Sequence, residues 1–350
     1  MQVDLPYRID AVQALVGHSE RAWNAAWNPD KPLLATCSAD KTVRMYSYTD
    51  SSTGPTFTHV TTIPTGHTKT VRSVAWAPSG NTLATASFDA NIGIWEQEAA
   101  EEEGGPKGDW ECASLLEGHE TECKSVAYSA SGTLLASCSR DKTVWIWEVH
   151  PDADFECLSV LMEHTQDVKC VAWHPIEEIL ASGSYDDTIK LYLDDPSDDW
   201  FCFATLTGHT STVWSLAWSP TNSFLASASD DKTVRIWRRV AEHKWECALT
   251  IEGNDRTVFS VSWGIGKPGT PCLGWLAAVG GDGTIRVWEI SDNEDATALQ
   301  HKLIAEHPDA HGVHDLNTVS WCMRPGLEDM LATTGDDGET RIWRIETVES

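Results

Sequence analysis

Histidine and aspartate recur along this sequence at a fixed separation that could support chemistry. A histidine precedes an aspartate by 22 residues in five places, and a serine or threonine lies four residues before each aspartate. The five pairs are His18–Asp40, His67–Asp89, His119–Asp141, His164–Asp186 and His209–Asp231. Serine, histidine and aspartate form the acyl-transfer triad, in which serine attacks a carbonyl and histidine moves the proton. We interpret the sets as structural and expect no enzyme, because one enzyme has no use for several identical triads.

These pairs belong to a repeat that runs through the whole chain. An aromatic residue follows each histidine by nine residues, and another follows each aspartate by six. Two looser copies around Asp282 and Asp337 bring the number of copies to seven. Apolar and polar residues alternate within a copy, which predicts strands over 71–76, 82–87, 92–95 and 110–116 in the second copy. Four strands per copy make a blade, so we predict an all-β, seven-bladed β-propeller.

The two ends of the chain are predicted to close this ring. The last copy ends with the strand pattern at 340–345, and no outer strand follows it. The apolar–polar segment 7–15 precedes the first copy and has no blade of its own. We therefore expect a single propeller over residues 1–350, in which 7–15 completes the seventh blade with 316–345 and covers its edge.

Composition excludes several classes of function. The formal net charge of −28 opposes binding to nucleic acid and to anionic membranes. The sequence has no apolar run long enough for a membrane span, and its first residues do not resemble a signal peptide. The ten cysteines include no C-x-x-C pair and no zinc or ferredoxin spacing. We expect buried free thiols in a reducing compartment, with no metal and no cofactor.

The repeat resembles the WD40 family over nearly the whole chain. In that family a histidine, a Ser/Thr, the turn aspartate and a strand tryptophan form a hydrogen-bonded tetrad. The resemblance implies the sets His67, Thr85, Asp89 and Trp95; His119, Ser137, Asp141 and Trp147; and His209, Ser227, Asp231 and Trp237. The first and fourth copies carry Tyr46 and Tyr192 instead of tryptophan. The sixth copy lacks the histidine and the Ser/Thr, so we expect no tetrad there, and either His307 or His311 completes the seventh.

The resemblance also implies a partner-binding rim at the top face, where the loops before the first strand and after the second strand of each blade meet. WD40 propellers use the third and fifth residues after each histidine and the residue before the aspartate. The residues at those positions include Arg21, Trp23, Arg72, Phe88, Lys124, Arg140, Lys169, Tyr185, Trp214 and Phe259, and in the seventh copy Asp315, Asn317 and Asp336. Cations among aromatic residues suit a short peptide with an acidic group and an aromatic side chain. We expect Arg140 to bind the carboxylate of this peptide. The alternative is a rim of internal ion pairs, such as Arg140 with Glu122.

A second resemblance is narrower. Four copies begin their outer strand with aromatic-x-Cys, at Trp110–Cys112, Phe155–Cys157, Trp200–Cys202 and Trp245–Cys247. We interpret this pattern as a packing device. Together with the segments 135–148 and 212–218, the chain is similar to the WD40 subunit of the cytosolic iron–sulfur protein assembly machinery.

That similarity implies a non-catalytic scaffold in a complex that targets iron–sulfur clusters to apoproteins in the cytoplasm, with the nucleus as a second location. The implied partners are a MIP18-type assembly protein, a HEAT-repeat adaptor, an iron-only-hydrogenase-like cluster carrier and client proteins with C-terminal Trp or Phe. Two alternatives stay open. One is a WD40 scaffold of another complex, either a ubiquitin-ligase receptor or a chromatin subunit. The other is an enzyme with a site in the central channel.

Overall fold

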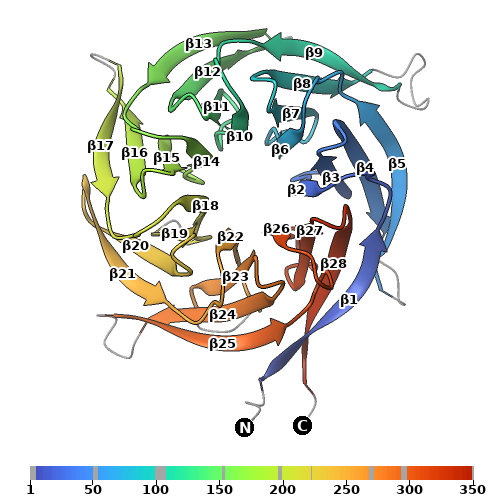
Figure 1. Cartoon of the computed structure of the whole chain (residues 1–350), viewed down its shortest axis with the longest axis vertical. Helices are drawn as coiled ribbons and strands as arrows, with labels where there is room; N and C mark the ends of the chain where they lie inside the picture. The colour runs from blue at the N-terminus through green and yellow to red at the C-terminus, as the bar shows by residue number, and fades with distance from the viewer. Residues whose placement is uncertain are drawn as a thin grey trace.

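The computed structural model describes residues 5–49, 54–98, 108–151, 154–195, 199–221, 223–267, 272–292 and 298–348. Seven antiparallel sheets of four strands stand in a ring around a central axis (Figure 1). The predicted all-β, seven-bladed propeller is confirmed. No helix in these ranges is long and apolar enough to cross a membrane. The sequence has two acidic segments, 96–105 and 194–199, of which residues 99–105 and 196–198 lie outside the described residues.

Each blade consists of four strands, called a to d from the axis outward, and blade 1 begins at β2. The a strands are β2 (Ala22–Trp27), β6 (Val71–Trp76), β10 (Cys123–Tyr128), β14 (Val168–Trp173), β18 (Val213–Trp218), β22 (Val258–Gly264) and β26 (Leu316–Trp321). The b strands are β3 (Leu33–Ser38), β7 (Thr82–Ser87), β11 (Leu134–Ser139), β15 (Ile179–Ser184), β19 (Phe224–Ser229), β23 (Gly274–Gly280) and β27 (Met330–Gly335). The c strands are β4 (Thr42–Thr49), β8 (Ile92–Gln97), β12 (Val144–His150), β16 (Ile189–Asp194), β20 (Val234–Ala241), β24 (Ile285–Asp292) and β28 (Thr340–Thr347). The d strands are β5 (Thr56–Pro64), β9 (Trp110–Leu116), β13 (Asp154–Leu161), β17 (Trp200–Leu206), β21 (Lys244–Ile251), β25 (Leu299–His307) and, in blade 7, β1 (Tyr7–Leu15).

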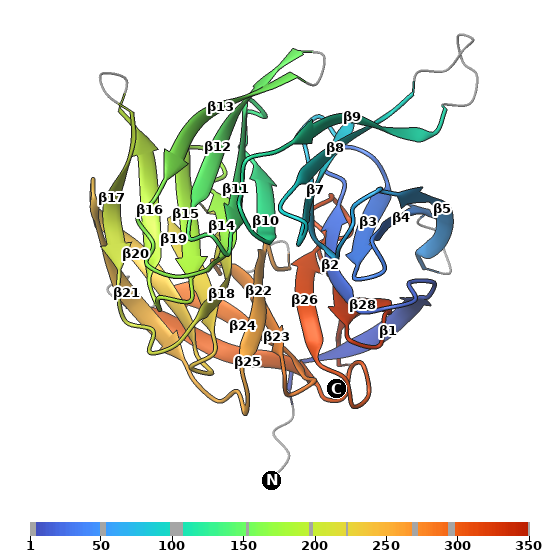
Figure 2. The same ribbon diagram turned by 45° about the horizontal axis from the view of Figure 1, so that its top comes forward.

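The core lies between neighbouring blades. Every residue of β11 is buried, because a b strand is covered by another sheet on each face. Ala136 and Ile146 of blade 3 pack against Val168 and Trp173 of blade 4. The innermost strands of adjacent blades lie side by side around the axis (Figure 2). Small residues on strand b therefore let neighbouring sheets approach closely near the axis, where the ring is narrowest.

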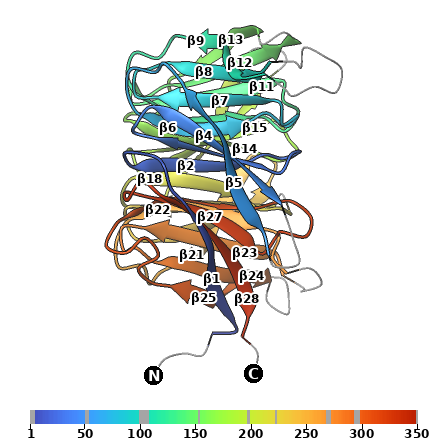
Figure 3. The ribbon, with the colours of Figure 1, turned by 90° about the vertical axis from the view of Figure 1, so that its right-hand side faces the viewer.

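The N-terminal strand closes the ring as predicted. Strand β1 pairs antiparallel with β28, with Tyr7 opposite Thr347 and Leu15 opposite Thr340. Ile9 and Leu15 are buried in the clusters on either side of blade 7. The start of β1 and the end of β28 consequently lie next to each other at the outer edge of the disc (Figure 3).

In blades 1, 2, 4 and 5, the tryptophan that ends strand a connects its blade to the previous one. The indole Nε1 of Trp76 donates to the carbonyl oxygen of Ala26 in blade 1 at 3.0 Å. Trp218 makes the same bond to Ala172 of blade 4 at 3.1 Å. Tyr128 replaces tryptophan in blade 3, and its buried hydroxyl has no hydrogen-bond partner among the described residues. This part of the repeat therefore fixes blade-to-blade spacing, a role that the sequence pattern did not reveal.

The cysteines are all free, but the prediction that they are buried is only partly right. Cys37, Cys123, Cys138 and Cys322 are buried, and burial raises the pKa of Cys37 to about 12. Cys112, Cys157 and Cys247 of the aromatic-x-Cys pattern are exposed instead. Strand d is the outermost strand, so one of its faces meets solvent. Only the aromatic member of the pattern packs inward, as when Trp110 makes an edge contact with Trp76.

Candidate functional site

Hydrogen-bonded sets of histidine, Ser/Thr, aspartate and tryptophan hold the top loops in place. In blade 3, His119 Nδ1 lies 2.9 Å from Asp141 and its Nε2 lies 2.8 Å from Ser137 Oγ. Trp147 Nε1 donates to the same hydroxyl at 3.0 Å. The equivalent residues of blades 2 and 5 are joined in the same way. Since the serine oxygen and the imidazole are buried, this arrangement suits a structural clamp between the d–a loop and the b–c turn.

The remaining blades vary the same clamp. In blade 7 the set is completed by His311, which contacts Asp337 at 2.9 Å and Thr333 at 2.8 Å. His307 packs its ring against Trp343 instead. In blade 4 the hydroxyl of Tyr192 takes the place of the indole and lies 3.3 Å from Ser182 Oγ.

Blade 6 contains a different network where no tetrad was expected. The buried guanidinium of Arg286 lies 2.6 Å from Asp282 and 2.9 Å from Glu306. Its Nη1 also donates to Asn254 Oδ1 at 3.2 Å. An arginine thus holds the turn aspartate that a histidine holds elsewhere. The repeat pattern did not indicate this role, although arginine also stands at this position in blades 1, 5 and 7.

The clamp aspartates should make the fold sensitive to acid. Burial alone would raise the pKa of Asp141, but hydrogen bonds from His119 and Thr143 outweigh burial and hold the pKa well below its ordinary value. Asp89 and Asp231 behave alike. A lowered pKa contributes stability that is complete above the ordinary aspartate pKa of about 3.9 and is lost as the pH falls below it. We expect the urea concentration at the unfolding midpoint to decrease as the pH is lowered below about 4. This decrease should be less steep in Asp141→Asn. Equal slopes for variant and wild type would contradict this.

A β-bulge at the same place in every blade directs one side chain toward the central axis. The a–b pairing skips the second residue of each a strand, as between Val71 and Ser73 in blade 2. The same shift occurs in the other six blades. The skipped residues are Trp23, Arg72, Lys124, Lys169, Trp214, Phe259 and Asn317. Bulges commonly re-aim a side chain in this way.

These seven side chains line a cavity of about 410 Å³ at the mouth of the central channel, which we call the top cavity. Arg21, Phe88, Asp315 and Asp336 from the top loops complete its lining. Of the thirteen residues named above at the partner-binding positions, eleven line this cavity, and Arg140 and Tyr185 do not. The bulge brings Arg72, Lys124 and Lys169 of blades 2 to 4 together with aromatic residues of the blades on either side, which are Trp23, Trp214 and Phe259. The acidic residues of blade 7 complete the wall.

Cations and aromatic rings are in contact throughout the cavity. The Arg72 guanidinium lies 4.6 Å from the centre of the Trp23 ring, and Lys124 Nζ lies 4.0 Å from that of Phe88. Lys169 Nζ lies 5.0 Å from the Trp214 ring and 5.3 Å from Tyr185. The buried Nε1 atoms of Trp23 and Trp214 have no hydrogen-bond partner among the described residues. The wall therefore offers aromatic faces, positive charge and free N–H donors.

Most charges in the cavity are already paired. Lys124 contacts Glu122, Lys169 contacts Asp167, and Arg21 contacts Asp336, each at 3.3 Å. Arg72 has no carboxylate within ion-pair distance in the described part of the chain. Burial lowers the pKa of Arg72, as expected of a cation that has lost water without gaining a counter-charge. Arg72 is thus the strongest candidate to bind an anionic group.

The predicted anchor, Arg140, lies on the exposed rim outside this cavity. Its guanidinium contacts Glu122 at 3.2 Å, and 59% of its side chain is exposed. This is the internal pair that the sequence left open as the alternative. An exposed pair of this kind contributes little binding energy to a ligand.

Comparison with known proteins identifies the family. The repeat described as WD domain, G-beta repeat matches residues 10–47, 57–96, 110–148, 155–192, 200–238 and 245–289. The chain belongs to the WD40 repeat family. Each matched segment runs from strand d of one blade to strand c of the next, and β26 to β28 of blade 7 lie beyond the last segment.

Several relatives of this WD40 chain carry informative names. A "probable cytosolic iron-sulfur protein assembly protein 1" of Mycosarcoma maydis is 48% identical over 169 residues, which cover 39% of this chain and 37% of that protein. A protein of the same name from Cryptococcus neoformans is 39% identical over 180 residues, 41% of either chain. A "probable cytosolic Fe-S cluster assembly factor" of Schizosaccharomyces pombe is 40% identical over 143 residues, 41% of this chain and 21% of that protein. The alignments thus cover less than half the length of these relatives.

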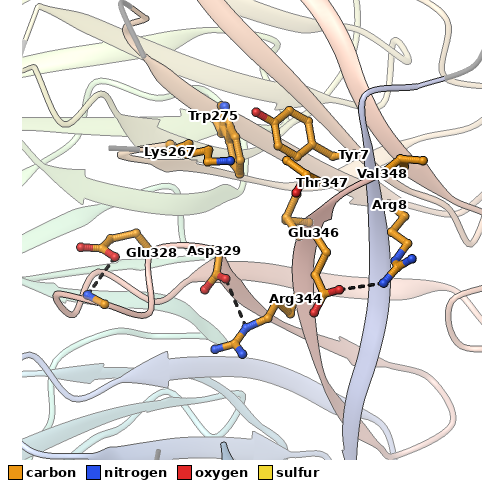
Figure 4. A pocket seen from close by; sticks show the side chains of 13 residues that line it. Tyr7, Arg8, Lys267, Trp275, Glu328, Asp329, Arg344, Glu346, Thr347 and Val348 are labelled. Atoms are coloured by element: carbon orange, nitrogen blue, oxygen red, sulfur yellow. Dashed lines mark hydrogen bonds and ion pairs between the residues drawn. The ribbon is translucent and has the colours of Figure 1, made fainter. Parts of the chain in front are cut away.

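The WD40 propeller has a second cavity, of about 750 Å³, where the chain ends meet blade 6 (Figure 4). Tyr7 makes an edge contact with Trp275 at its wall, with ring centres 4.9 Å apart. Arg8 contacts Glu346 at 2.8 Å, and Arg344 contacts Asp329 at 3.2 Å. Since these arginines pair with carboxylates of the wall itself, this cavity offers less free charge than the top cavity.

Proposed function

We propose that this WD40 protein is a non-catalytic scaffold of cytosolic iron–sulfur protein assembly, which recruits apoprotein clients for cluster insertion. The names of its relatives support the pathway, and the fold supports a role in holding other proteins. Its proposed partners are the MIP18-type protein, the HEAT-repeat adaptor, the hydrogenase-like cluster carrier and clients with C-terminal Trp or Phe. The proposed location is the cytoplasm, and also the nucleus.

The observation that carries this proposal is the unpaired Arg72 among aromatic side chains at the channel mouth. A carboxylate of a client tail would supply the missing counter-charge and accept charge-assisted hydrogen bonds from the guanidinium. An aromatic side chain of the same tail would pack against Trp214 and Phe259, whose rings already meet edge to face at 5.5 Å. The cavity is large enough for a few side chains rather than a folded domain.

Replacing Arg72 by glutamine should weaken binding of a peptide that ends in an acidic residue and tryptophan by about ten- to hundredfold. Hydrogen bonds to charged groups contribute about 1.5–3 kcal/mol, and each 1.4 kcal/mol is tenfold in affinity. Fluorescence anisotropy with a labelled peptide measures the change, and circular dichroism checks the fold. Arg140→Gln removes the same charge from the rim and should weaken binding less. A larger loss in Arg140→Gln would place the client site on the rim.

The pathway itself is tested by affinity purification of the full chain with mass spectrometry. Recovery of cluster-assembly factors is the expected result. Recovery of ubiquitin-ligase or chromatin subunits without any assembly factor would favour the other scaffold class and overturn the proposal.

A further inference from the structure

In blades 2 to 4, the residue before the a strand decides whether the cation two positions later has a carboxylate partner. In blades 3 and 4 it is acidic, so Glu122 pairs with Lys124 and Asp167 pairs with Lys169. Blade 2 has Thr70 at this position, which leaves Arg72 without a carboxylate. Blade 7 has the opposite arrangement, a carboxylate without a cation, because Asp315 is followed two residues later by the neutral Asn317.

Asn317 does not compensate Asp315. Its amide donates to Asp336 Oδ1 at 3.0 Å and to the carbonyl oxygen of Ala22 at 2.9 Å. Asp336 in turn pairs with Arg21. Asp315 makes no ion pair within the described ranges, although it lines the top cavity. One uncompensated cation and one uncompensated anion therefore face the same cavity, on the two blades that flank blade 1.

Blade 6 leaves the Asp315 carboxylate open. The position before the turn aspartate carries Phe88, Arg140 and Tyr185 in blades 2 to 4, but Gly281 in blade 6. A Cβ atom at Gly281 would lie 3.7 Å from Asp315 Oδ2, so a larger side chain here would reach the carboxylate. Arg256 of the neighbouring loop donates to the carbonyl oxygen of Gly281.

We propose that the segment bound in the top cavity is dipolar, with its acidic group at Arg72 and a basic side chain further upstream at Asp315. This inference rests on the proposed function of the cavity and adds a second recognition element to it. A basic group is favoured over a neutral donor because the formal charge of −28 attracts cations to the whole surface. Complementary charges at two points also fix the direction in which the segment lies, which a single anchor does not.

The test uses peptides that share an acidic residue and tryptophan at the C-terminus and carry Lys, Gln or Glu at one of the four preceding positions. We expect wild type to bind the Lys peptide about fivefold more tightly than the Gln peptide at one of these positions. Asp315→Asn should remove this preference. Asn317→Lys rebuilds the pairing of blades 3 and 4 and should remove it too. Asp309→Asn, which loses the same charge from an exposed site on the same loop outside the cavity, should retain it.

Two outcomes overturn the inference alone: equal affinity for Lys and Gln peptides at every position, or a preference that survives in Asp315→Asn. In either case, loss of Gln-peptide binding in Arg72→Gln would still support the proposed function. If wild type binds none of the peptides, or if Arg72→Gln binds all of them as tightly as wild type, the proposed client site fails and the dipolar segment fails with it.

Discussion

A chain that lacks residues 1–15 is expected to lose the cooperative unfolding transition of the full chain and to aggregate. The deletion removes the outer strand of blade 7 and exposes the full length of the β28 edge, which pairs with β1 from Tyr7 to Leu15. An unpaired strand edge is a template for association with other chains. The deletion also removes Ile9 and Leu15 from two separate clusters of the core. Thermal unfolding, monitored by circular dichroism, measures the loss of cooperativity. Size-exclusion chromatography measures aggregation.

A point substitution separates packing from edge exposure in the same strand. Ile9→Ala leaves β1 paired but empties a buried position, which should cost about 2–5 kcal/mol of unfolding free energy. Arg8→Ala changes an exposed residue of the same strand, whose ion pair with Glu346 of β28 is solvated, and should cost far less than Ile9→Ala. A truncated chain that melts like the full-length protein would show that β1 does not hold the ring closed.

The strands were largely predictable because the repeat is expressed in local pattern. The expected strands 71–76, 82–87 and 110–116 coincide with β6, β7 and β9, and 7–15 coincides with β1. The alternation of apolar and polar residues and the aspartate turn can both be recognised within one short segment, without knowing which distant residues it contacts. Even the closure by 7–15 followed from counting, because seven blades with one strand missing leave one place for an orphan strand.

The site was less predictable because it depends on which charges meet across the ring. Position in the repeat placed Arg72 and Arg140 on the same rim, but only geometry separates the enclosed guanidinium from the exposed one. The bulge that directs one residue per blade toward the axis has no signature in a single copy. Asp315 occupied a partner-binding position in the sequence, yet its lack of a counter-charge required the positions of Asn317 and Asp336.

Replacing Arg286 by methionine should lower the free energy of unfolding by about 3–5 kcal/mol. The arginine is buried and pairs with Asp282, whose side chain is only 10% exposed. Breaking a buried pair by removing one partner leaves the other charge uncompensated, and this cost falls in that range. In blades 1 to 5 and 7 a histidine would still hold the turn aspartate, but blade 6 has Asn254 at that position. Equilibrium unfolding in urea, followed by tryptophan fluorescence, measures the loss.

Arg235→Met in blade 5 is the matched control, since Arg235 stands at the equivalent position of a blade whose clamp is complete. There His209 holds Asp231 at 2.7 Å, and the arginine makes no ion pair within the described residues. Its removal should cost about 1 kcal/mol, the centre of the range for single substitutions. Similar losses in the two variants would mean that Arg286 contributes packing alone. A much larger loss in blade 6 would mean that a guanidinium holds the turn aspartate there, as the histidine does in the other blades.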